Sequence, residues 1–203
     1  MLDPHFVVVA AALSVAGSAA YVRDTLRGVT TPHRVTWGLW ALEGTLAYAV
    51  EIQQRVGLAS LMTLALGLTP LVVFLASFKN AHAAWKIDAF DVGCGVVSLG
   101  GVVLWAALNQ PTAALLSFAA ADFIAALPTY RKAWRAPESE TARTFVLGAF
   151  NTGITLLTLR VVTTAGALFP GVIMVTDSIL SVVILTRLGP RFARRTTRGG
   201  SLA

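Results

Sequence analysis

The chain alternates between long apolar stretches and short segments that carry charges, prolines or several polar residues together. An apolar run of roughly 17–25 residues is the length that an α-helix needs to cross the hydrocarbon core of a bilayer. The pattern therefore predicts an all-α integral membrane protein with seven transmembrane helices. They are expected near residues 5–22, 36–54, 57–78, 88–108, 112–130, 144–162 and 166–187.

Composition strengthens this prediction. A soluble protein carries about 25% charged and 45–50% apolar residues, whereas this chain of 203 residues has 13% charged and 56% hydrophobic residues. A cleaved signal peptide over residues 1–20 is the alternative for the first helix, but such a peptide begins with basic residues. No Lys or Arg precedes Val7, so we expect the first helix to be retained.

The basic residues predict how the helices are oriented. Cytoplasmic loops of membrane proteins are enriched in Lys and Arg, and fourteen of the sixteen basic residues fall on one side of the predicted spans. The other side holds Arg55 and Arg160. The sequence therefore predicts a multi-pass protein of the cell membrane with its amino terminus outside and its carboxyl terminus in the cytoplasm. The net charge of +6 then reflects topology and contact with membrane lipids, and no nucleic-acid partner is expected.

An internal repeat appears when the chain is shifted by 108 residues against itself. Helices one to three then fall on helices five to seven, and Thr36-Trp37-Gly38-Leu39 aligns with Thr144-Phe145-Val146-Leu147. We expect a first three-helix repeat at 1–83, a linker helix at 84–110, a second repeat at 111–187 and a basic cytoplasmic tail at 188–203. Four spans separate the copies, so both repeats have the same orientation in the membrane.

One segment resembles a known family. Residues 122–135, with Pro128 near the cytoplasmic end of a helix, followed by Ser139-Glu140-Thr141, resemble the PQ-loop signature of SWEET-like and cystinosin-like membrane proteins. Thr129 stands where that family has Gln, and the first repeat lacks the Pro-Gln pair. The resemblance covers residues 5–187 through the 3+1+3 layout. It implies an alternating-access transporter of a small polar solute, such as an amino acid, a sugar or a cation, with or without proton coupling.

Polar residues at membrane depth are costly and usually mark a pathway or a structural pair. Through the repeat they form three aligned pairs, each with one carboxylic acid, and a tryptophan lies one turn from the acid of the second helix. The expected substrate and proton pathway comprises Ser14 with Asp122, Glu43 with Asn151, Thr69 with Asp177, and Trp40. Pro70 and Pro128 are the expected hinges, because proline weakens a helix. The alternative is that these residues only hydrogen-bond between packed helices.

Other chemistry finds no support in the sequence. No nucleotide-binding, nucleophile-elbow or HExxH motif is present, so we expect no enzymatic activity and no cofactor. His5, His33 and His82 lack ligand partners at metal-binding spacing, and the single cysteine, Cys94, cannot form an intramolecular disulfide. Formation of a homo-oligomer is left open. The alternative function is a non-transporting membrane protein with the same fold, such as an assembly factor, a lipid-binding protein or a receptor.

Overall fold

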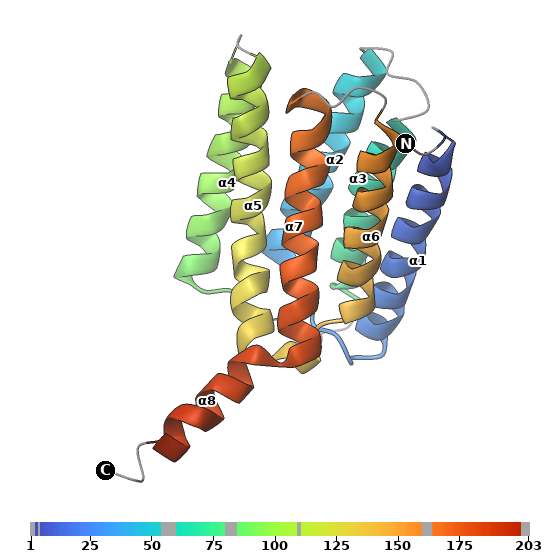
Figure 1. The fold of residues 1–203 in the computed structure, drawn as a ribbon. Helices are drawn as coiled ribbons and strands as arrows, with labels where there is room; N and C mark the ends of the chain where they lie inside the picture. Colours follow the sequence, from blue (N-terminus) through green and yellow to red (C-terminus); the bar gives the residue numbers. More distant parts are fainter. Residues whose placement is uncertain are drawn as a thin grey trace.

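The computed structural model describes residues 3, 5–53, 60–79, 85–108, 111–159 and 164–199. Within these residues every regular element is helical. Seven long helices lie side by side, and an eighth leaves the bundle at one end (Figure 1). The elements are α1 (Phe6–Leu26), α2 (Arg34–Gln53), α3 (Ser60–Ala76), α4 (Ala89–Ala107), α5 (Pro111–Arg135), the short 3₁₀ segment η3 (Pro137–Ser139), α6 (Ala142–Thr158), α7 (Thr164–Thr186) and α8 (Leu188–Gly199).

Consecutive helices run in opposite directions, so α1, α3, α5 and α7 all end at the same end of the bundle (Figure 1). We call this the basic end, because eleven described Lys and Arg residues lie in its helix termini, its connections and the first turn of α8. They are Arg23, Arg27, Arg34, Lys79, Lys86, Arg131, Lys132, Arg135, Arg143, Arg187 and Arg191. Arg55 and Arg160, expected at the opposite end, lie outside the described residues.

The helices pack in two groups of three. Helices α1 and α2 both pack on α3, and helices α5 and α6 both pack on α7. Between the groups, α1 packs on α6 and α2 packs on α5. Exchanging α1–α3 with α5–α7 therefore leaves this set of pairings unchanged. Helix α4 has no equivalent in this exchange of the two groups. It packs mainly on α5 and also on α2.

Helix α4 begins within one residue of the predicted start at residue 88, at a capping box. The Asp88 side chain accepts hydrogen bonds from the backbone N–H groups of Phe90 (3.0 Å) and Asp91 (3.2 Å), and the Asp91 side chain accepts from the Asp88 N–H at 3.0 Å. Such reciprocal bonds satisfy donors that the first turn of a helix leaves free.

The second group of helices departs from the predicted boundaries. Helix α5 continues to Arg135, past the predicted end at residue 130, even though Pro128 lies inside it. Trp134 is therefore part of this helix, and its ring stacks on Phe192 of α8 at 5.8 Å between centroids. Helices α7 and α8 are separated at Arg187, whose φ of 51° is in the left-handed region and turns the chain away from the bundle (Figure 1).

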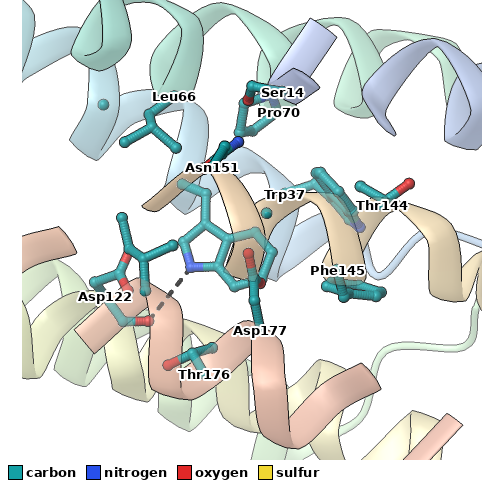
Figure 2. Close-up of a pocket in the computed structure, with 14 residues that line it drawn as sticks. Ser14, Trp37, Leu66, Pro70, Asp122, Thr144, Phe145, Asn151, Thr176 and Asp177 are labelled. Carbon is teal, nitrogen blue, oxygen red and sulfur yellow. Dashed lines mark hydrogen bonds between the residues drawn. The ribbon is translucent and has the colours of Figure 1, made fainter. Parts of the chain in front are cut away.

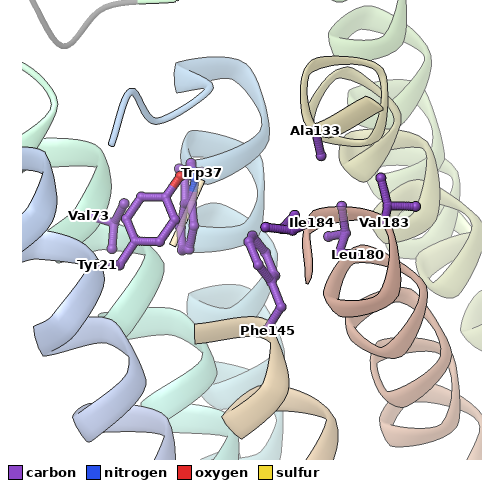
Figure 3. Close-up of a cluster of buried hydrophobic side chains, with 8 residues drawn as sticks. All are labelled: Tyr21, Trp37, Val73, Ala133, Phe145, Leu180, Val183 and Ile184. Atoms are coloured by element: carbon purple, nitrogen blue, oxygen red, sulfur yellow. The ribbon is translucent and has the colours of Figure 1, made fainter. Parts of the chain in front are cut away.

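The main hydrophobic cluster joins both groups of helices near the basic end. Figure 3 shows its members, which come from all six helices of the two groups: Tyr21, Trp37, Val73, Ala133, Phe145, Leu180, Val183 and Ile184. Tyr21 and Trp37 are in ring contact, with centroids 4.6 Å apart. This cluster fills the space between α1–α3 and α5–α7 on one side of the site described below.

The outward faces of the bundle are strongly apolar. Large hydrophobic side chains remain exposed on most helices, including Val8, Val72, Val96, Val103, Phe150 and Leu185. By length and composition, α1 and α4 are each able to cross a membrane, and the apolar stretches Ser60–Ala76 and Pro170–Thr186 are shorter. Only 22% of the apolar window of α4 is buried, so this helix is not a buried core helix.

Candidate functional site: a central polar pocket

A pocket of about 80 Å³ lies between the two groups of helices (Figure 2). A volume of about 10–15 Å³ suffices for one water molecule, so the pocket has room for a small polar group. Every helix of the two groups contributes to its wall, and α4 contributes no lining residue. The lining residues are Ser14, Trp37, Trp40, Gly44, Leu66, Pro70, Asp122, Thr144, Phe145, Gly148, Asn151, Ile173, Thr176 and Asp177.

Two carboxyl groups line the pocket, Asp122 from α5 and Asp177 from α7. Asp177 lies against Gly148 of α6 so closely that a Cβ atom at Gly148 would overlap its Oδ2 atom. The glycine therefore provides the space that the Asp177 side chain occupies. Among the described residues, no side chain or backbone group makes a hydrogen bond to the Asp177 carboxyl group.

Asn151 of α6 is fully buried and lines the pocket. Neither its Oδ1 nor its Nδ2 atom has a hydrogen-bond partner in the described part of the chain, and the same holds for Oγ1 of Thr176. Buried polar groups in proteins are nearly always hydrogen-bonded. These atoms are therefore available to bind something that enters the pocket.

Aromatic rings form one wall. Trp37 and Trp40 of α2 are in edge-to-face contact, with their ring centroids 5.4 Å apart and their planes at 82°. Phe145 of α6 continues the wall, 6.3 Å from Trp37. The Trp40 Nε1–H group donates a long hydrogen bond of 3.4 Å to the backbone carbonyl of Asp122 (Figure 2), which connects the wall to α5.

Glu43 lies behind the pocket and does not line it. Its side chain is fully buried, and the Ser98 hydroxyl of α4 lies within hydrogen-bond distance of both its Oε1 atom (3.0 Å) and the Ala121 carbonyl (2.9 Å). The other carboxyl oxygen of Glu43, Oε2, is buried and has no hydrogen-bond partner among the described residues. Because the same Ser98 hydroxyl reaches the carbonyl of Ala121, the neighbour of Asp122, Glu43 lies near Asp122.

The structure thus brings together several of the residues predicted for the pathway: Ser14, Trp40, Asp122, Asn151 and Asp177 line the pocket, as does the predicted hinge Pro70. Trp37, Phe145 and Thr176 were not among the predicted pathway residues. The repeat aligns Trp37 with Phe145, and Thr176 is a polar residue directly before Asp177; these are the signals that could have pointed to them.

Besides Glu43, two further predicted residues do not line the pocket. Thr69 donates its hydroxyl to the Ala65 carbonyl of its own helix at 2.8 Å, and it lines a groove between α1 and α3 on the outside of the bundle. The Thr69 hydroxyl therefore has a hydrogen-bond partner within its own helix and does not depend on a partner in the pocket. Pro128 is buried in α5 but does not line the pocket.

A polar network closes the basic end between the two groups of helices. The fully buried Lys132 donates from Nζ to Oε1 of Glu140 at 2.7 Å, to the Ser139 carbonyl at 3.3 Å and to the Thr31 carbonyl. The Tyr21 hydroxyl donates to the other carboxylate oxygen of Glu140 at 2.5 Å.

The fold and the pocket define a helical bundle with a central pocket that is acidic, amide-bearing and aromatic. Comparisons of the chain with protein-family models, with curated proteins and with solved structures find no match. The likeness to PQ-loop proteins therefore stays an expectation from the sequence.

Proposed function

We propose that the protein is a multi-pass membrane protein in which α1–α7 all cross the bilayer. Exposed Val and Leu side chains on α4 and on the outer faces of the other helices support this, because such apolar surface is costly in water. The basic end supports the predicted cytoplasmic side, since Lys and Arg gather there and the side chains described at the opposite end include no Lys or Arg. The exchange of α1–α3 with α5–α7 supports two parallel repeats joined by α4.

Its function, in this proposal, is to carry a small polar solute across the membrane by alternating access. The observation that carries the proposal is the central pocket, because all six helices of the two groups line it and the Asn151 amide has no hydrogen-bond partner in the described part of the chain. A site formed by both groups opens to opposite sides when one group rocks against the other. Tyr21, Lys132 and Glu140 close the basic end here, so this conformation is shut on the proposed cytoplasmic side.

Pro70 is the hinge that this cycle would use. It lies inside α3 and lines the pocket, and a proline removes one backbone hydrogen bond and bends its helix. A bend at this height moves one half of α3 relative to the other. The other predicted hinge, Pro128, lies inside α5 six residues after Asp122, toward the basic end, and can serve the same purpose for the second group.

Uptake into proteoliposomes tests the proposal. Purified protein is reconstituted, and uptake of pooled labelled amino acids, sugars and small amines is followed with and without an inward proton gradient. We expect uptake by the unmodified protein and a loss of most uptake in the double variant Glu43→Gln/Asp177→Asn. Glu138→Gln is the matched control, because Glu138 is an exposed carboxylate in η3, away from the pocket. No uptake of any pool by demonstrably folded protein would favour the non-transporting alternative.

A further inference from the structure

The pocket has negative and polar groups but no positive one among its described lining residues, since no Lys, Arg or His lines it. We propose that its solute is a small organic cation, a primary or quaternary ammonium compound, and that the cation enters in exchange for a proton held by the pocket's carboxyl groups. This inference rests on the proposed carrier function and names the substrate class of the same site.

The electrostatic argument begins with Asp177. A carboxylate that leaves water without a positive partner is strongly destabilised, and the described residues supply no Lys, Arg or His to the wall that holds Asp177. Two species can neutralise such a group: a proton bound to it or a cation from solution. A neutral solute such as a sugar does neither. The charge of the pocket therefore favours a cationic solute over an uncharged one.

The aromatic wall fits the same class of solute. Trp37 and Trp40 pack edge to face, Phe145 lies beside Trp37, and all three rings line the pocket. The face of an aromatic ring is the negative part of its quadrupole and attracts ammonium groups, so several rings around one pocket suit a methylated ammonium group. An anionic solute would meet both the carboxyl groups and these ring faces unfavourably.

Asn151 provides a third and independent observation. Its buried Oδ1 atom has no described partner, and a carbonyl oxygen accepts from an N–H or O–H donor. A solute with an ammonium or hydroxyl donor would satisfy it. The amide also remains neutral at every pH, so it can orient the solute without altering the charge balance of the pocket.

The exchange with protons follows from two carboxyl groups that line one pocket. Asp122 of α5 and Asp177 of α7 both border it, Glu43 of α2 lies near Asp122, and no Lys, Arg or His lines it among the described residues. Tyr130 of α5 is a further titratable group that interacts with both aspartates. In the absence of a bound cation, protons are the neutralising charges available to these carboxyl groups. When a cation binds beside Asp122 and Asp177, it takes the place of a proton as the neutralising charge, and that proton leaves to solvent.

Direct binding tests the inference without transport. Purified protein in detergent micelles is titrated with two cations and with their uncharged analogues, ethanolamine against ethylene glycol and choline against 3,3-dimethylbutan-1-ol. Calorimetry and tryptophan fluorescence report binding, and a weakly buffered solution with a pH indicator reports proton release. We expect at least one cation to bind about tenfold or more tightly than its uncharged analogue, with release of protons. The affinity should weaken as the pH falls, because protons compete for the carboxyl groups.

Three variants separate a specific site from general electrostatics. Asp177→Asn keeps the shape of the side chain but removes its charge, and we expect it to weaken cation binding by about tenfold or more and to reduce proton release. Trp40→Phe should weaken quaternary ammonium binding and diminish the fluorescence change. Glu138→Gln, remote from the pocket, should bind as the unmodified protein does. If Glu138→Gln and Asp177→Asn weaken cation binding equally, the pocket is not the cation-binding site.

The outcomes distinguish this inference from the carrier proposal. If the uncharged analogues bind as well as the cations, the inference is wrong and the carrier proposal stands. If the cations do not bind but the proteoliposomes accumulate a sugar or another neutral solute, the substrate class is wrong and the carrier is right. If neither binding nor uptake is found with folded protein, both proposals fail.

Discussion

At the scale of single residues, the ion pair between Lys132 and Glu140 is the contact on which the closed basic end depends most. Both side chains are fully buried, and the pair connects α5 to the chain that leads into α6, with Tyr21 of α1 as a further donor. Removing one partner of a buried pair leaves an uncompensated charge and costs about 3–5 kcal/mol, whereas replacing both by apolar residues of similar volume is often tolerated.

The first prediction follows from this asymmetry. Glu140→Leu and Lys132→Met should each lower the free energy of unfolding by about 3–5 kcal/mol, and the double variant should lose much less than the sum. Denaturant unfolding of the purified protein, followed by tryptophan fluorescence, measures the three values. Additive losses would mean that the two side chains do not interact in the folded protein.

His33 gives a second prediction, on pH. It is buried in the connection before α2, with its Nε2 atom 3.2 Å from Oδ2 of Asp91. Burial lowers the pKa of His33, and the positive charge of Lys132 lowers it further. The carboxylates of Asp91 and Asp88 raise it, but burial has the larger effect. The unfolded chain therefore binds a proton more readily than the folded one. The contribution of His33 to the free energy of unfolding is therefore full above its pKa in the unfolded chain, about 6.5. This contribution declines as the pH falls from there toward the lower pKa of the folded protein.

The measurement compares two proteins. Unfolding free energies of the unmodified chain and of His33→Gln are determined between pH values of about 5 and 8, the range in which an ordinary histidine titrates. We expect a decline toward low pH in the unmodified protein and a flatter profile in the variant. Parallel profiles would show that His33 is charged equally in the folded and unfolded states.

Residue positions could be predicted from the sequence where polarity itself is the signal. Ser14, Asn151 and Asp177 stand out because polar groups are rare within long apolar helices, and the structure brings all three to one pocket. Contacts between distant residues could not be predicted in this way. Glu43 accepts a hydrogen bond from Ser98, 55 residues later in the chain. Lys132 forms an ion pair with Glu140, which lies in a segment whose polar composition predicted only a connecting loop.

At the scale of helices, α2 and α3 approach each other closely. A Cβ atom built on Gly44 would lie 2.6 Å from the Cα atom of Gly67, and one built on Gly67 would lie 2.8 Å from the Thr45 nitrogen. Backbone therefore meets backbone at this crossing, as small residues permit in membrane helices. Gly44 also lines the pocket, so the crossing helps to set the pocket's width.

The third prediction concerns this crossing. Gly44→Ala should force α2 and α3 apart and lower stability by about 1–3 kcal/mol, the usual cost of overpacking. Gly100→Ala in α4 is the matched control, because nothing lies within 4 Å of a Cβ atom there. The control should be neutral or stabilising by up to about 1 kcal/mol, since alanine favours a helix over glycine. Thermal unfolding in detergent compares the two, and an equal effect would contradict a tight crossing.

The helices themselves were largely predictable, and their ends were not. Apolar runs give the α1 and α4 spans to within a few residues, and Asp88 signals the start of α4. The extension of α5 to Arg135 was missed, because Pro128 and the basic residues after it indicated an end. Within the helix, the Tyr130 hydroxyl donates to the Thr176 carbonyl at 2.9 Å, and this contact with α7 helps to hold the segment beyond the proline.

At the scale of the whole molecule, α4 breaks the symmetry that relates the two groups. Shifted by 108 residues, Glu43 corresponds to Asn151, yet Asn151 lines the pocket and Glu43 turns away from it. The difference has a physical reason, since α4 lies beside α2 and offers the Ser98 hydroxyl, while the described part of the chain offers no counterpart to α4 beside α6. Helix α4 thereby holds Glu43 outside the pocket, near Asp122.

The last prediction tests the orientation of the whole bundle. The two ends differ in charge, so the basic end should lie in the cytoplasm and His5 should lie outside. Cys94, the single cysteine, is buried, and replacing it by alanine provides a background for His5→Cys and Glu138→Cys, both at exposed positions. A membrane-impermeant maleimide should label His5→Cys on intact cells and Glu138→Cys only after permeabilisation. The reverse pattern would invert the topology, and labelled protein recovered in the soluble fraction would contradict a membrane-spanning bundle.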